Sequence, residues 1–101
     1  MDALSIKTKI SEDFHYLHAH PELSYQEYET TALIKKELTA AGIKILPLKL
    51  ETGAVAEIGS KGRCVALRCD IDALPVQEET SLPYKSVNSG VMHACGHDFH
   101  T

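Results

Sequence analysis

The last ten residues of the chain concentrate side chains that bind metal ions. Residues 92–101 contain His93, Cys95, His97, Asp98 and His100. Thiolate, neutral imidazole and carboxylate groups are the donors that proteins offer to Zn²⁺ and similar divalent ions. A bound ion can activate water for attack on a carbonyl carbon. The segment therefore indicates metal chemistry.

Cys95 and His97 are the two strongest candidates for metal ligands. One residue separates them, so in an extended backbone both side chains leave on the same side and can reach one ion. Gly96 lies between them and removes any Cβ clash. The same pair is also typical of a small buried cysteine beside a hydrogen-bonded loop histidine. The spacing leaves both interpretations open, and two donors fill only part of a metal site.

The residues next to this pair have alternative roles. His93 and His100 either bind the ion, orient its ligands or contact a substrate. Asp98 is expected first of all to cap the helix that follows, and alternatively to accept a hydrogen bond from a ligand histidine.

Two carboxylates precede this segment at the end of an apolar run. Asp70 and Asp72 share one face of an extended chain, and Pro75 restricts the loop after them. Such a carboxylate can hold a histidine ligand in one tautomer. A simple turn is the equal alternative, because Asp is common in turns. Glu78 and Glu79 are expected to be solvated.

The N-terminal half is predicted to form two helices. Ile6, Ile10, Phe14 and Leu17 recur at helical spacing, which predicts a helix over residues 3–19 that Pro21 ends. Ser24 and Glu27 have the spacing of a capping box, which predicts a second helix over residues 25–41, stopped by Gly42. At the junction between the two helices, His18, His20 and Glu22 are expected to cap and pair locally.

Strands are predicted after Gly42. The candidates are residues 43–46, 54–58 and 64–69, and the glycines of residues 59–62 favour a hairpin between the last two. Residues 64–67 are apolar without alternation, which predicts a strand covered on both faces, with Cys64 and Cys69 in the core. The pattern as a whole indicates an α/β fold with helices packed on a sheet.

Composition narrows the class of protein. A chain of 101 residues fits one small domain, and 44% hydrophobic with 24% charged residues is typical of a globular protein. A formal charge of −4 argues against nucleic acid as a partner. No apolar run approaches the roughly 20 residues that span a bilayer. Three cysteines and the lack of a secretory signal favour reduced thiols and a cytoplasmic location.

Three motifs in order resemble one known family. They are the runs at residues 18–24 (HAHPELS), 67–75 (LRCDIDALP) and 90–100 (GVMHACGHDFH). Together they resemble the N-terminal part of the aminoacylase-type metal-dependent amidohydrolases. That family includes hippurate hydrolases, N-acetyldiaminopimelate deacetylases and auxin-conjugate hydrolases. Cys69 departs from the small alanine-like residue that is usual in the family.

The resemblance implies a fold, a site and a substrate class. It implies part of an α/β/α sandwich in which two N-terminal helices are followed by strands of a mixed sheet. Residues 1–101 would be the N-terminal portion of the catalytic domain, without the rest of that domain or the lid domain. Cys95 and His97 would bind one of two divalent ions (Zn, Mn, Ni or Co), and Asp72 would orient a ligand. The substrates would be N-acyl amino acids or similar small amides.

The complete enzyme of such a family would also need residues that this chain lacks. The glutamate pair that supplies the general base, and the later histidine ligands, lie beyond Thr101 in relatives, and the complete enzyme is expected to be a homo-oligomer. The 101-residue chain alone is therefore predicted to be inactive. One alternative is a non-catalytic metal-binding or interaction module that needs a partner chain. Another is a cysteine hydrolase that uses Cys95 with His97 or His100 as base.

Overall fold

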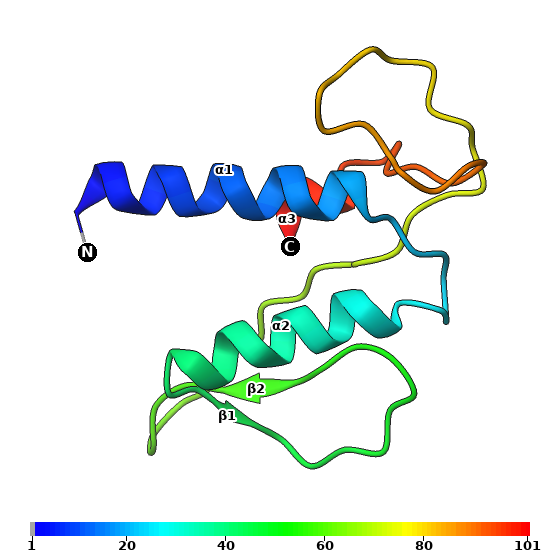
Figure 1. Cartoon of the computed structure of the whole chain (residues 1–101). Helices are drawn as coiled ribbons and strands as arrows, with labels where there is room; N and C mark the ends of the chain where they lie inside the picture. Colours follow the sequence, from blue (N-terminus) through cyan, green and yellow to red (C-terminus); the bar gives the residue numbers. More distant parts are fainter. Residues whose placement is uncertain (1) are drawn as a thin grey trace.

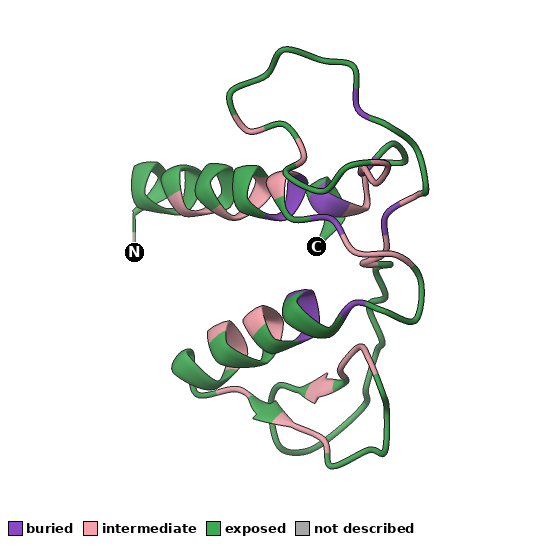
Figure 2. Cartoon of the chain, turned by 45° about the vertical axis from the view of Figure 1, so that its right-hand side comes forward, coloured by how far each residue is buried: buried purple, intermediate pink, exposed green. Residues whose placement is uncertain are grey.

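The computed structural model describes residues 2–101, and its longest element is an N-terminal helix. Helix α1 spans Ala3–Ala19, as the periodicity predicted. The Asp2 carboxylate caps it by accepting a hydrogen bond from the Ser5 N–H at 2.8 Å. Ile6 and Ile10 are exposed, whereas Leu17 and His18 are buried. Burial of α1 is therefore concentrated in its last turn (Figures 1 and 2).

Helix α2 spans Tyr28–Ala40, three residues shorter at its start than predicted. The predicted capping box is wrong, because Tyr25 has a φ of +65° and no helix can pass through that conformation. Instead the Glu22 carboxylate accepts hydrogen bonds from the backbone N–H groups of Glu29 at 3.0 Å and Thr30 at 2.6 Å. Gly42, with a φ of +75°, follows the end of the helix as predicted.

A small antiparallel sheet packs beside α2. Strand β1 spans Lys44–Ile45 and strand β2 spans Ala56–Glu57, with Lys44 opposite Glu57 and Ile45 opposite Ala56. Helices followed by strands confirm the α/β class (Figure 1). The mixed sheet and the complete sandwich stay predictions.

The predicted hairpin between residues 54–58 and 64–69 is wrong. Gly59 and Gly62 do adopt positive φ angles, as a turn requires. However, β2 pairs with β1, and residues 64–69 form no strand in the described chain. A strand exists only when a neighbouring strand supplies its hydrogen bonds. Val65 and Leu67 are accordingly 96% and 101% exposed.

Cys64 and Cys69 are also exposed, so their predicted place in the core is wrong. Apolar residues such as those of the run 64–67 are compatible with burial on both faces of a strand. Such burial also requires neighbouring layers that cover the strand, and the run itself does not provide them. In the part of the chain that the structure describes, those layers are not present over this run.

The C-terminal half of the chain is mostly loop and ends in a short helix, α3, over His97–His100. This helix packs against α1 (Figure 1). The buried residues gather at the last turn of α1, at α3 and in the loops between them, and a second group lies at the start of α2 (Figure 2). None of the described helices combines the length and apolar character needed to cross a bilayer.

Candidate functional site

Asp72 and His97 lie in contact although 25 residues separate them. The His97 ring nitrogen Nδ1 is 2.9 Å from the Asp72 carboxylate Oδ1 and 2.9 Å from the Asp72 backbone carbonyl. Because both partners are acceptors, Nδ1 carries the proton. In the neutral ring, Nε2 then presents its lone pair away from Asp72. This is the arrangement that a metal-binding imidazole requires.

Short backbone bridges hold Asp72 in place. Ala73 forms a parallel bridge with Leu23, and Leu74 forms an antiparallel bridge with Met92. The Ala73 N–H donates to the Glu22 carbonyl at 2.8 Å. Residues 72–74 therefore lie between the segment before α2 and the segment that leads to Cys95.

A further contact fixes the second oxygen of Asp72. The Ser24 hydroxyl donates a hydrogen bond to Asp72 Oδ2 at 3.0 Å. Burial opposes ionisation of Asp72, but hydrogen bonds from Ser24, its own backbone and His97 outweigh that effect and lower its pKa. Asp72 is therefore a carboxylate at neutral pH. Its Oδ1 accepts from His97 and its Oδ2 accepts from Ser24.

Cys95 lies just before α3 and is an exposed free thiol. Gly96, with a φ of +84°, occupies the position before the first residue of α3. A residue with a Cβ would be strained in that conformation. Gly96 thus allows the backbone conformation that connects Cys95 to His97, two residues later.

The remaining candidates have separate surroundings. Asp70 is exposed; its carboxylate pairs with Arg68 at 2.6 Å and lies 3.9 Å from His97 Nε2. His93 is buried, and its Nδ1 has no hydrogen-bond partner among residues 2–101. Burial lowers the pKa of His93 and favours the neutral ring. His100 is exposed at the end of α3.

The donor chemistry fits part of a site for a divalent ion. An accessible thiol and an imidazole whose Nδ1 is already held by a carboxylate are both suitable ligands. Within residues 2–101, no group of three or more His, Cys, Asp or Glu side chains is arranged to hold an ion. The metal-binding role of Cys95 and His97 thus stays a prediction, and further donors are needed.

A buried cluster next to this site was not predicted from the sequence. His18 Nδ1 lies 2.7 Å from Asp98 Oδ2, and His18 Nε2 lies 3.0 and 3.1 Å from the two oxygens of Glu78. Glu78 is only 1% exposed, so the prediction that it is solvated is wrong. Asp98 does not cap α3 either, because Gly96 holds that position. His18 pairs with partners distant in sequence, whereas His20 and Glu22 bond locally as expected.

Only one sequence signal pointed to this cluster. His18 follows Phe14 by four residues and Leu17 by one, so it lies on the inward face of α1. Its carboxylate partners are 60 and 80 residues away, and no spacing rule connects them. Glu78 also accepts hydrogen bonds from the Thr80 hydroxyl and, at 2.8 Å, from the Ser86 N–H.

The cluster predicts how stability depends on pH. Burial disfavours the charged ring, but hydrogen bonds to Glu78 and Asp98 outweigh it and raise the pKa of His18 above 6.5. Burial also opposes ionisation of Glu78, yet hydrogen bonds from Thr80, Ser86 and His18 lower its pKa from 4.5 to about 2.

His18 therefore stabilises the fold fully below its unfolded pKa of 6.5, and this contribution is lost as pH rises through the raised value. Glu78 contributes fully above 4.5, and its contribution is lost as pH falls toward about 2. Urea unfolding at stepped pH is expected to show the greatest contribution of the pair between 4.5 and 6.5. A Glu78→Gln variant should lose the acid-side slope; an unchanged slope would contradict the assignment.

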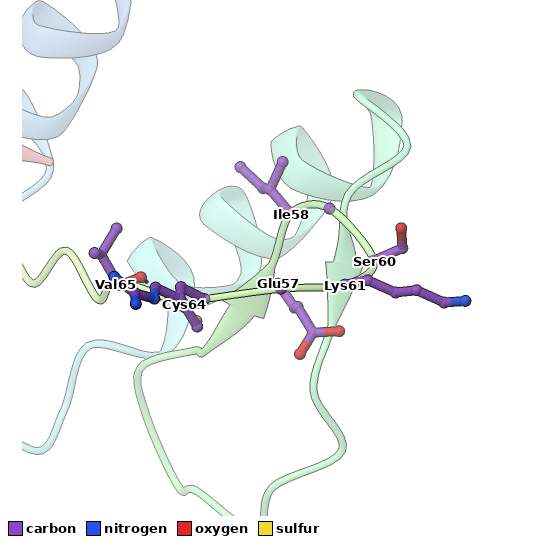
Figure 3. A pocket seen from close by; sticks show the side chains of 9 residues that line it. Glu57, Ile58, Ser60, Lys61, Cys64 and Val65 are labelled. Atoms are coloured by element: carbon purple, nitrogen blue, oxygen red, sulfur yellow. Dashed lines mark hydrogen bonds between the residues drawn. The ribbon is translucent and has the colours of Figure 1, made fainter.

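A surface hollow lies next to β2. It is lined by Glu57 at the end of β2 and by the loop that follows, including Lys61 and Cys64 (Figure 3). None of the predicted site residues lines it.

Comparisons with known proteins show which family the chain resembles. The sequence pattern described as Peptidase family M20/M25/M40 matches residues 66–101, which include Asp72, Cys95 and His97. The N-acetyl-L-cysteine deacetylase of Bacillus subtilis (strain 168) is 59% identical over 88 residues, which are 85% of this chain and 21% of that protein. A second protein of that strain, N-acetylcysteine deacetylase, is 56% identical over 88 residues, which are 84% of this chain and 23% of that protein.

A solved structure has the same fold. The Bacillus subtilis YXEP protein, described as a dinuclear metal binding peptidase from the M20 family, superposes with a TM-score of 0.94 at 48% sequence identity. The match covers 98% of this chain and 28% of that one. The chain thus spans about a fifth to a quarter of the length of the two curated relatives.

Proposed function

Because the chain belongs to the M20-type amidohydrolases, whose N-terminal part it matches, we propose that it supplies part of a metal-dependent active site that hydrolyses N-acyl amino acids. Residues 1–101 form the N-terminal portion of the catalytic domain in this proposal. The rest of that domain, with the other metal ligands and the general base, and a lid domain belong to the same longer polypeptide.

One observation carries the proposal. Asp72 holds Nδ1 of His97, so Nε2 points away from Asp72 with the Asp70 carboxylate at 3.9 Å, and the accessible thiol of Cys95 lies two residues before His97. Cys95 and His97 would bind a divalent ion, and Asp72 would keep His97 in the tautomer and orientation that ligation needs. When bound, the ion polarises the amide carbonyl and activates water.

The buried cluster limits which groups of this chain take part in proton transfer. Glu78 is 1% exposed and paired with His18, so its carboxylate is not accessible to a substrate. The general base is therefore proposed to come from the remainder of the polypeptide. His93, buried and neutral beside the site, contributes no charge there.

N-acetyl-L-cysteine is the first substrate to test, because two relatives are named for deacetylating it. The complete polypeptide, loaded with Zn²⁺, Mn²⁺, Co²⁺ or Ni²⁺, is expected to release acetate from it. A chelator should abolish the release and added metal should restore it. The 101-residue chain alone is expected to release none.

Two outcomes would contradict the proposal. Acetate release that persists in chelator but stops on thiol alkylation would favour a cysteine hydrolase. Stoichiometric metal binding by the complete polypeptide without hydrolysis of any N-acyl amino acid would favour a non-catalytic metal-binding module. A cytoplasmic location and a homo-oligomeric state are proposed with the function.

A further inference from the structure

The buried cluster ties α1 directly to the segment that carries the candidate metal ligands. The His18 side chain is 10% exposed and lies between two carboxylates, Glu78 and Asp98. Each ring nitrogen of His18 has a carboxylate partner: Nδ1 lies 2.7 Å from Asp98, and Nε2 lies 3.0 and 3.1 Å from the two oxygens of Glu78. Charge-assisted hydrogen bonds of this kind are short and directional. The cluster is therefore a defined link between three segments.

This link acts on a helix that cannot hold its own position. Helix α3 has four residues, far fewer than the roughly 12 to 15 that an isolated helix needs to be even marginally stable in water. Its placement must come from contacts with the rest of the molecule. It packs against α1 (Figure 1). At this contact His18 of α1 binds Asp98 of α3.

Asp98 and His97 are consecutive residues in α3, so their side chains leave the helix about 100° apart. Asp98 bonds to His18 of α1, and His97 bonds to Asp72 on the other side. The first turn of α3 is thus fixed from two directions. Without the His18 link, rotation of this short helix would move Nε2 of His97 and the thiol just before it.

We propose that His18 is a positioning residue for the metal site: by holding Asp98, it fixes α3 so that His97 and Cys95 face the same ion. This inference rests on the proposed function, since it requires Cys95 and His97 to be ligands. Glu78 has a supporting part, because it binds the other nitrogen of His18 and keeps the ring in one orientation.

The test compares metal binding by variants of the complete polypeptide. His18→Gln, Asp98→Asn and the double variant are titrated with Co²⁺, with thiolate-to-cobalt absorption as the signal, and with Zn²⁺ against a chelating dye. His15→Gln is the matched control, because His15 lies one turn earlier on α1 and stacks on Tyr84. Urea unfolding of each apo variant reports stability separately.

His18→Gln is expected to weaken metal binding by about 10- to 100-fold, the range seen when a partner that orients a ligand is lost. Its cobalt spectrum should also change, which a loss of global stability alone would not produce in the folded protein. Asp98→Asn should have a similar effect. The double variant should bind no worse than either single variant, because both act through one hydrogen bond. His15→Gln should bind as the unmodified protein does.

Wild-type affinity and spectrum in His18→Gln, or losses that add in the double variant, would overturn the inference. If His18→Gln does not fold, Asp98→Asn decides alone, because it keeps the His18–Glu78 pair; wild-type metal binding in that variant would refute the positioning role. Cys95→Ser separates the two proposals. If it leaves the cobalt absorption unchanged, the proposed function itself is wrong; if it abolishes the absorption while His18→Gln does not alter it, only the positioning role is wrong.

Discussion

Replacing Cys95 with serine is expected to weaken metal binding by the complete polypeptide by more than about 100-fold, the upper end of the effect of losing a group that only orients a ligand. A serine hydroxyl stays protonated at neutral pH and cannot replace the charge or softness of a thiolate. Metal content after dialysis, the thiolate-to-cobalt absorption and acetate release should all fall together.

Cys64→Ser is the matched control for this prediction, because Cys64 is also an exposed free thiol. It lies in the loop after β2 and lines the hollow of Figure 3, which neither Asp72 nor His97 lines. This variant should retain metal and activity. Equal losses in both variants would show that oxidation or misfolding, rather than ligation, explains the effect.

Replacing Glu78 with alanine is expected to lower the free energy of unfolding by about 3 to 5 kcal/mol, as when one partner of a buried ion pair is removed. The change leaves His18 with one carboxylate, and it removes the acceptor of the Ser86 N–H and of the Thr80 hydroxyl. A domain of ordinary stability has about 5 to 15 kcal/mol in total, so much of it would be lost. Urea unfolding near pH 6 measures the effect.

Glu79→Ala provides the comparison, since Glu79 is the exposed neighbour with the same side chain. Its effect should stay within about 0.5 kcal/mol, as is usual at the surface. If the two variants unfold at the same urea concentration, the His18–Glu78 pair does not stabilise the protein.

The helices were predictable because their signals are local. Residues 3–19 carry their own apolar period and end before Pro21, and the structure has the helix at those bounds. The start of α2 could not be predicted in this way. Its cap comes from Glu22, six residues before the first helical residue, across a turn in which Tyr25 has a positive φ. A spacing rule for a capping box does not include such a contact.

The prediction of a strand over residues 64–69 was wrong for a related reason. Residues 64–69 have the composition of a buried strand, but pairing depends on what lies beside them. The candidate site was only partly accessible to sequence reasoning. Asp72, Cys95 and His97 were selected by residue type, spacing and family resemblance. His18 and Glu78 were not assigned to a common cluster, because a contact across 60 residues leaves no trace in a single sequence.

Glu22 determines where this chain tolerates changes in length. Its carbonyl binds Ala73 while its carboxylate binds the first turn of α2. An inserted residue between positions 23 and 28 would separate those two attachments and shift Asp72 relative to α2. The exposed glycine-containing loop at residues 59–62 has no such double attachment, so natural variants with extra residues should accumulate there.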